Sequence, residues 1–95
     1  MLLVDLREVG ERTRHGVLSG ALHAPYPAIS DSLQPGGMLR EVAKATGRRI
    51  VFVCAYGERS AMAVRAATDA GFLTAAHLEG GIDAWKKAGG PVIAG

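Results

Sequence analysis

The most informative part of this chain is Ile50-Val51-Phe52-Val53-Cys54-Ala55-Tyr56-Gly57-Glu58-Arg59-Ser60. Its first four residues are β-branched or aromatic, which is typical of a strand at the centre of a parallel sheet. The strand delivers the only cysteine of the chain into a short loop that contains Gly57, and an alanine-rich helix is expected to begin at Ser60. This order predicts a cup of backbone N–H groups around the sulfur atom.

Cys54 is therefore expected to be a reactive thiolate. The positive end of the helix dipole favours a negative charge in front of the helix, and Arg59 adds a second positive charge, so that both lower the pKa of the thiol. A lone cysteine at the end of a strand is more often an inert buried residue. The loop with Gly57 and Arg59, followed by a helix, favours the reactive site.

The bulk composition excludes several classes of function. The 95 residues carry a net charge of +2 and are 48% hydrophobic, which predicts a single globular domain over residues 1–95. The basic residues are scattered, so no nucleic-acid partner is expected. One cysteine excludes an intrachain disulfide, and the three histidines lack the spacing of metal ligands, so no metal site is predicted.

No targeting or membrane segment is evident in these residues. The apolar residues at the amino terminus are too few for a signal peptide, and no stretch approaches the length of a transmembrane helix. A reactive unpaired thiol persists in a reducing compartment, so we expect a cytoplasmic location and no membrane partner.

The remaining sequence alternates strands with helices. This alternation predicts an α/β fold, a small and mostly parallel sheet flanked by helices, with Cys54 beyond the carboxyl end of its strand. A short helix or an irregular turn is expected over residues 7–15. Ser30-Asp31-Ser32 is expected to cap a helix, and Trp85 is expected to lie in the core. Strands are expected at residues 2–6, 21–23, 50–53 and 75–78, and helices at about 38–45, 60–70 and 82–88.

Four landmarks in series resemble the rhodanese-like domains, the family of thiosulfate sulfurtransferases and their relatives. They occur in the family's order and extend over nearly the whole chain. The landmarks are Val4-Asp5-Leu6-Arg7, the stretch from His15 to Pro25, the loop Cys54-Ala55-Tyr56-Gly57-Glu58-Arg59-Ser60, and the stretch from Leu78 to Trp85.

The chain departs from the family pattern in two places. Ser19 stands where the family usually has proline, which is a local matter of the loop. The sequence also begins at the strand of the first landmark, whereas family members usually carry a helix and a strand before it. An uncovered strand edge promotes self-association, so a monomer or a weak dimer is expected.

The length of the loop separates two chemistries within the resemblance. The related Cdc25-type phosphatases have seven residues from cysteine to arginine, which encircle a phosphoryl group. Here Cys54 to Arg59 spans six, and the smaller cup suits a single sulfur atom. The resemblance thus implies that Cys54 attacks a sulfane sulfur donor, holds the sulfur as a persulfide, and yields it to an acceptor without a cofactor.

The resemblance also assigns a role to each residue around Cys54. The backbone N–H groups of Ala55 through Ser60 would stabilise the thiolate and the persulfide, with Gly57 allowing the turn. Arg59 would bind an oxyanion of the donor, Tyr56 and Glu58 would form the rim, and Glu58 would discourage small anionic donors. Asp5 and Arg7 would form a hydrogen-bonded pair that supports the loop.

Two further functions remain as alternatives at this point. The first is a non-enzymatic module that carries a persulfide or docks another protein. The second is a phosphatase or an arsenate reductase, which the short loop disfavours. In the leading interpretation the partners are thiosulfate or a persulfide as donor, a thiol or cyanide as acceptor, and a sulfur-relay protein.

Overall fold

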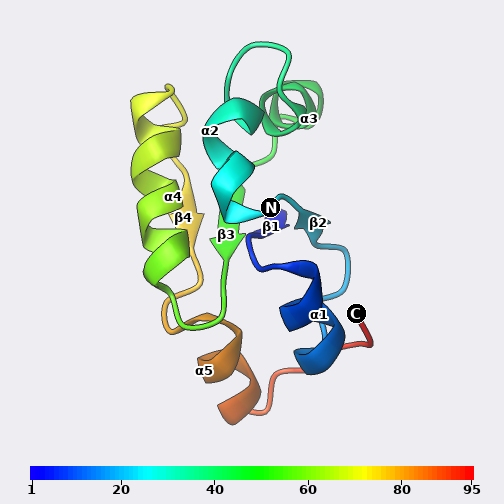
Figure 1. Ribbon diagram of the computed structural model, residues 1–95. Helices are drawn as coiled ribbons and strands as arrows, with labels where there is room; N and C mark the ends of the chain where they lie inside the picture. Colours follow the sequence, from blue (N-terminus) through cyan, green and yellow to red (C-terminus); the bar gives the residue numbers. More distant parts are fainter.

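Four parallel strands form the centre of the molecule, and helices pack around them (Figure 1). The computed structural model describes residues 1–95. The predicted α/β class is confirmed, because the sheet has the order β2-β1-β3-β4 and each neighbouring pair is parallel. The strands are β1 (Leu2–Asp5), β2 (Leu22–His23), β3 (Ile50–Val53) and β4 (Ala76–His77).

The helices lie close to their expected positions, with one difference. Residues 7–15 contain the short helix that was one of the two expected forms, whereas Ser30-Asp31-Ser32 belongs to a short helix instead of capping a later one. A separate helix follows after Gly37, where a side chain would not fit because its Cβ would lie 2.3 Å from the carbonyl oxygen of Asp31. The helical elements are α1 (Val9–His15), the 3₁₀ turn η1 (Tyr26–Ala28), α2 (Ile29–Ser32), α3 (Met38–Thr46), α4 (Glu58–Asp69) and α5 (Gly81–Lys87).

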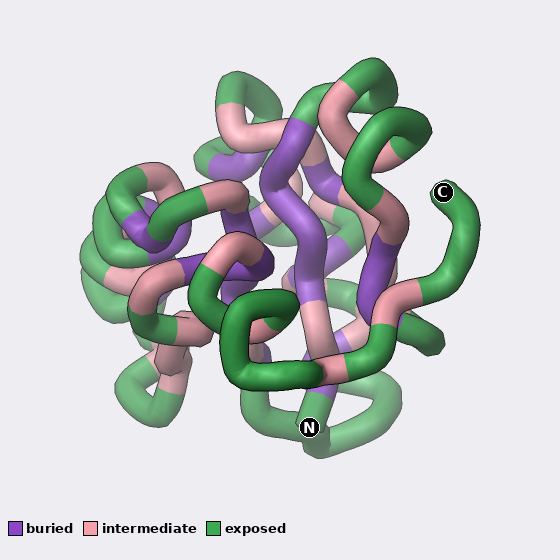
Figure 2. Tube along the Cα trace, turned by 90° about the horizontal axis from the view of Figure 1, so that it is seen from below, coloured by how far each residue is buried: buried purple, intermediate pink, exposed green.

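Alternation along the strands divides the core into two unequal parts. Successive side chains of a strand point to opposite faces, so Val4 and Phe52 share one face while Val53 belongs to the other. The larger cluster contains Leu33, Leu39, Ala63 and Ala67 from the segments of α2, α3 and α4. The smaller cluster joins Val53 to Leu18 and Ile82. The buried segments run through the middle of the molecule in Figure 2.

The sheet has short edges. The first strand, β1, lies inside the sheet, where it pairs with β3 over all four of its residues and with β2 on its other side. The edge strands β2 and β4 have two residues each. Such short edges offer little length for pairing with another chain.

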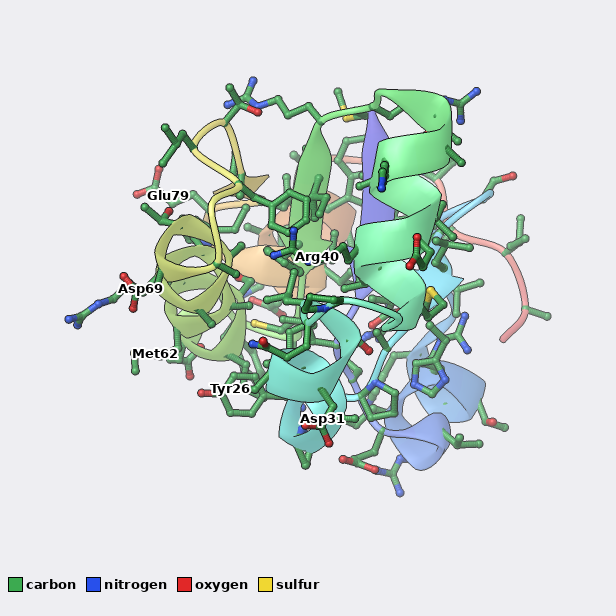
Figure 3. All side chains as sticks on the ribbon, turned by 90° about the horizontal axis from the view of Figure 1, so that it is seen from above. Tyr26, Asp31, Arg40, Met62, Asp69 and Glu79 are labelled. Carbon is green, nitrogen blue, oxygen red and sulfur yellow. The ribbon has the colours of Figure 1, made fainter.

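One arginine satisfies the carboxyl ends of two helices. Arg40 on α3 donates from Nε to the carbonyl oxygen of Leu33, the C-cap of α2, and from Nη2 to that of Ala70, the C-cap of α4, each at 2.7 Å. Its guanidinium lies 4.9 Å from the centre of the Phe72 ring (Figure 3). A cation at these helix ends complements both dipoles and fixes α4, whose other end holds the candidate site.

Trp85 packs against the smaller core cluster, but it is less buried than expected of a core residue. Its indole is half-buried, and its Nε1–H donates to the carbonyl oxygen of Pro91 at 2.9 Å because the chain turns back over the ring at Gly90. The ring lines an apolar groove of about 550 Å³ together with Leu3, Leu78 and Ile93. The tail beyond it forms an antiparallel bridge between Ile93 and Val17. No helix has the length and apolar character needed to cross a bilayer.

Candidate active site

The sulfur atom of Cys54 lies at the carboxyl end of β3, where the loop to α4 folds around it. Cys54 is 1% exposed. Its Sγ accepts N–H hydrogen bonds from Gly57 at 3.1 Å and Ser60 at 3.4 Å, and Oγ of Ser60 lies 3.5 Å away. Gly57 is the N-cap of α4 and has φ 108°, a conformation that favours glycine. Of the N–H groups of Ala55 through Ser60 that were expected to surround the sulfur, those of Gly57 and Ser60 donate to Sγ.

Burial and hydrogen bonding act on the thiol in opposite directions. Burial has the largest single effect and raises the pKa of Cys54, because it penalises the charged form. The hydroxyl of Ser60 and the backbone N–H groups of Ser60, Gly57 and Tyr56 lower it, and together they outweigh burial. The net pKa lies below the ordinary value for cysteine, which favours the nucleophilic thiolate.

The amino-terminal turn of α5 holds the outer side of the loop. The carbonyl oxygen of Cys54 accepts a hydrogen bond from Ile82 N–H at 2.9 Å, and that of Ala55 accepts one from Asp83 N–H at 3.0 Å. Gly81 makes this contact possible, since a Cβ atom there would lie 2.4 Å from the carbonyl oxygen of Ala55. The glycine-rich turn before α5 is thus a support of the loop.

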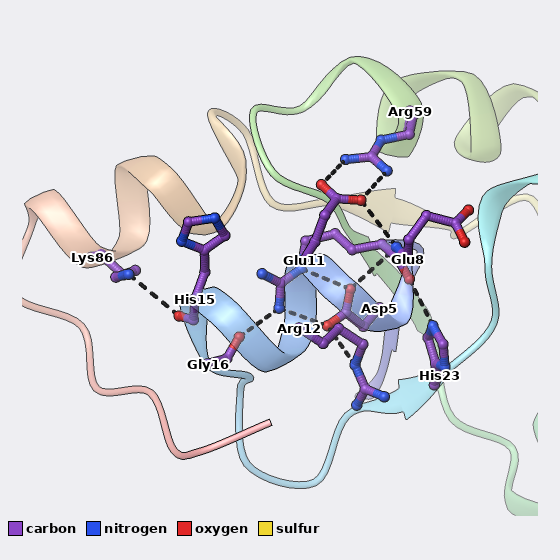
Figure 4. Close-up of polar contacts among 10 residues, drawn as sticks. Asp5, Glu8, Glu11, Arg12, His15, Gly16, His23, Arg59 and Lys86 are labelled. Atoms are coloured by element: carbon purple, nitrogen blue, oxygen red, sulfur yellow. Dashed lines mark hydrogen bonds and ion pairs between the residues drawn. The ribbon is translucent and has the colours of Figure 1, made fainter.

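Arg59 is held by an acidic partner from another helix. Its Nη1 and Nη2 donate to the two carboxylate oxygens of Glu11 on α1, each at 2.8 Å (Figure 4). This bidentate pair lowers the pKa of Glu11 to about 2 and raises that of Arg59. We expected Arg59 to offer a free fork to an oxyanion, and this geometry corrects that expectation because Glu11 occupies the fork.

Asp5 and Arg7 form the buried pair that the resemblance implied. Arg7 donates from Nε and Nη2 to the carboxylate of Asp5 at 3.1 and 2.9 Å, and its Nη2 also donates to the carbonyl oxygen of Gly16 at 2.7 Å. Arg12 adds a third contact to Asp5 from α1 at 3.2 Å (Figure 4). These bonds fix the segment between β1 and α1 that faces the Cys54 loop.

The family model for the rhodanese-like domain matches residues 1–88 of this sequence. The chain belongs to the rhodanese-like domain family.

Individual relatives agree with this assignment. A mouse protein called thiosulfate sulfurtransferase/rhodanese-like domain-containing protein 3 is 29% identical over 92% of this chain and 57% of its own length. An uncharacterised protein of Synechocystis sp. is 33% identical over 98% of this chain and 47% of its own. This rhodanese-like chain therefore spans about half the length of the curated relatives that it matches.

Solved structures share the fold. A Rhodopseudomonas palustris protein described as a possible tyrosine phosphatase has a TM-score of 0.86 and 34% identity, over 96% of this chain and 69% of its own. A rhodanese-related protein of Thermoplasma volcanium has a TM-score of 0.75 and 28% identity, over 99% of this chain and 84% of its own. The parallel sheet and its helices are thus those of known rhodanese-like proteins.

A cavity of about 330 Å³ lies beside the active loop of this rhodanese-like domain. Its walls include Ala55 and Tyr56 from the loop, buried Arg7, and Asp83 and Lys86 from α5. Tyr56 is 65% exposed and stands at the predicted rim. Glu58 is also exposed, but it does not line this cavity.

The basic residues at the cavity differ in their partners. Nζ of Lys87 lies 3.1 Å from the Asp83 carboxylate, whereas Nζ of Lys86 contacts the backbone carbonyl of His15 at 3.3 Å (Figure 4). The charge of Lys86 is therefore not cancelled by a carboxylate.

Three contributions to this site were missed in the sequence. Glu11 was missed because its partner is 48 residues away in the sequence and no motif includes Glu11. The hydroxyl of Ser60 and the ring of His77 were also missed, although His77 Nδ1 lies 2.9 Å from Ser60 Oγ. His23 has a different partner from His77, because its Nε2 donates to the carbonyl oxygen of Arg7 at 2.6 Å. No cluster of three or more metal-ligating side chains is formed.

We predict that Glu11→Gln lowers the free energy of unfolding at neutral pH by about 1 kcal/mol, the scale of a well-formed ion pair near the surface. Because folding lowers the pKa of Glu11 from 4.5 to about 2, its charge stabilises the fold above pH 4.5, and this contribution is lost as the pH falls towards 2. Urea unfolding across this range should show the difference from the wild type shrinking. Glu58→Gln is the control, and a difference that persists at pH 2 would contradict the prediction.

A second prediction concerns Gly81. Gly81→Ala should displace the carbonyl oxygen of Ala55 and disturb the N–H groups around Sγ, so that the pH midpoint of Cys54 alkylation rises and stability falls. Gly20→Ala is the matched control, since Gly20 has φ 79° but no atom within 4 Å of an added Cβ. Equal effects of the two substitutions would show that positive φ alone is responsible.

Proposed function

We propose that this rhodanese-like domain is a sulfurtransferase that carries a sulfane sulfur on Cys54. The observation that supports this most directly is the set of donors on Sγ, namely the N–H groups of Gly57 and Ser60 and the nearby Ser60 hydroxyl. These donors stabilise a sulfur anion, which is the reactive form before and after sulfur transfer. The mouse relative carries thiosulfate sulfurtransferase in its name, and the Thermoplasma volcanium protein is described as rhodanese-related.

The proposed reaction has two displacement steps at sulfur. With thiosulfate as donor, the Cys54 thiolate attacks the outer sulfur, the S–S bond of thiosulfate breaks, and sulfite leaves with the bonding electron pair. An acceptor thiolate or cyanide then attacks the terminal sulfur of the persulfide. The Cys54–persulfide S–S bond breaks, and its electron pair returns to Cys54 as the thiolate.

A persulfide carrier that depends on a partner protein is the second candidate. The fork of Arg59 is occupied by Glu11, so a small oxyanion gains less from this residue than a free arginine would give. In this version the first step is the same, but the acceptor is a cysteine of another protein. The two candidates differ in turnover with small acceptors.

Phosphatase activity is less well supported, although one structural neighbour is described as a possible tyrosine phosphatase. A phosphoryl group needs donors that point to its oxygens. In this loop the N–H groups of Gly57 and Ser60 point to Sγ itself, and the arginine is paired with Glu11. Hydrolysis of an aryl phosphate that is lost in Cys54→Ser would favour this function instead.

We predict that incubation with thiosulfate adds one sulfur atom to Cys54, and that a thiol or cyanide removes it. Intact-protein mass spectrometry measures both steps. Cys54→Ser should stay at its original mass, and its circular dichroism should match the wild type, because the substitution changes one buried atom. A wild-type protein that gains no sulfur from either thiosulfate or a low-molecular-weight persulfide would overturn the proposed function.

A further prediction concerns how anionic donors approach the cavity. Lys86→Gln should slow persulfide formation from thiosulfate roughly threefold to tenfold, because it removes an unpaired positive charge at the cavity wall. Lys87→Gln is the matched control and should have a smaller effect, since Lys87 already pairs with Asp83. Stopped-flow assays at low and high salt measure both variants, and equal slowing would contradict the role of Lys86.

A further inference from the structure

The hydroxyl group of Ser60 lies among three polar atoms in a fully buried position. Its Oγ is 2.9 Å from Nδ1 of His77, 3.1 Å from the carbonyl oxygen of Gly57 and 3.5 Å from Sγ of Cys54. Ser60 is 0% exposed, so water does not substitute for any of these neighbours. Its hydrogen bonds are therefore decided by these three atoms.

The number of protons available limits the hydrogen bonds that the Ser60 hydroxyl can form with these three atoms. A hydroxyl has one proton to donate and two lone pairs that accept. The carbonyl oxygen of Gly57 and the thiolate of Cys54 are acceptors only. If Nδ1 of His77 also accepted, three acceptors would compete for one proton, and the closest of the three would be His77 rather than the sulfur.

We propose that His77 is a positioning residue whose Nδ1–H donates to Oγ of Ser60, so that the single hydroxyl proton is kept for the carbonyl oxygen of Gly57 at 3.1 Å and the Cys54 sulfur at 3.5 Å. The histidine then fills an acceptor position of the hydroxyl and no longer competes for its proton. A hydroxyl that accepts one hydrogen bond is polarised and donates a stronger one. When Cys54 is a thiolate, its negative charge makes it a stronger acceptor than the neutral carbonyl of Gly57, and the chain His77–Ser60–Cys54 then stabilises it.

Three separate elements build this chain. His77 is on β4, where it pairs with Phe52 of β3, two residues before Cys54. Ser60 is in the first turn of α4, and its side chain faces the sheet. His77 also lines the apolar groove, where the other side chains carry no charge. The Ser60 hydroxyl is therefore the polar group that meets Nδ1 of His77.

The proposal deepens the proposed function, on which its catalytic importance rests, but it is tested on the resting thiol without a sulfur donor. The measurement is the pH dependence of Cys54 alkylation by iodoacetamide, followed by intact mass. His77→Leu should raise the midpoint by roughly one pH unit, equivalent to about 1.4 kcal/mol. Ser60→Ala should have a similar effect, and adding His77→Leu to it should cause no further rise.

A pair of equal-sized variants keeps the test valid if the leucine variant does not fold. Asn at position 77 offers an amide N–H to Ser60, whereas Asp offers acceptors and adds a negative charge. His77→Asn should keep a midpoint near that of the wild type, and His77→Asp should raise it. Part of the rise caused by Asp should disappear in the Ser60→Ala background, because only its charge acts there.

Two results would overturn the proposal. One is a folded His77→Leu or His77→Asp variant with the midpoint of the wild type. The other is a shift of the same size in the presence and absence of the Ser60 hydroxyl, which would mean that His77 acts by packing or charge alone. A protein that shows the expected midpoints but forms no persulfide would overturn the proposed function and leave the hydrogen-bond chain intact.

Discussion

The hydrogen bonds from α5 to the outer side of the active loop are the constraint on which the rest of the site depends. Ile82 and Asp83 donate to the carbonyl oxygens of Cys54 and Ala55. The N–H and C=O groups of one peptide plane point in opposite directions. A loop whose carbonyl groups point outward to α5 must therefore turn its N–H groups inward, and this is how the backbone N–H of Tyr56 comes to lower the pKa of Cys54.

A second set of interactions joins the amino-terminal helix to the same loop. Asp5 binds two arginines, Arg7 and Arg12, while Glu11 binds Arg59. Each carboxylate in this group is matched by a guanidinium, and α1 supplies a partner to both the β1 end and the loop. Because the Glu11–Arg59 pair is bidentate, it fixes the orientation of Arg59 as well as cancelling its charge.

Much of the site could be predicted from the sequence because its signals are local. The apolar strand, the cysteine, the glycine and the helix start follow one another within residues 50–60, and the backbone alone then places N–H groups near the sulfur. These features need no knowledge of distant partners, which is why the strand positions and the cup were predicted well.

The remaining features depend on contacts between distant residues. Arg59 was expected to be free because nothing near it in the sequence is acidic except Glu58, and its partner Glu11 comes from another helix. His77 reaches Ser60 only through the pairing of β3 with β4. Trp85 was expected in the core, but the fold leaves one side of its ring in the apolar groove. In each case the tertiary arrangement decides which partner is available.

Opposing effects on the pKa of Cys54 bear on how the proposed sulfur transfer would work at a buried nucleophile. A thiol with a very low pKa is ionised but is a weak nucleophile, and attack is fastest when its pKa lies near the ambient pH. Burial raises the pKa of Cys54, and the hydrogen bonds around Sγ lower it. Because the charge of Arg59 is paired with Glu11, the arginine lowers the pKa of Cys54 less than an unpaired arginine would. Burial thus limits how far the hydrogen bonds around Sγ lower the pKa of Cys54, a balance that suits the proposed sulfur transfer.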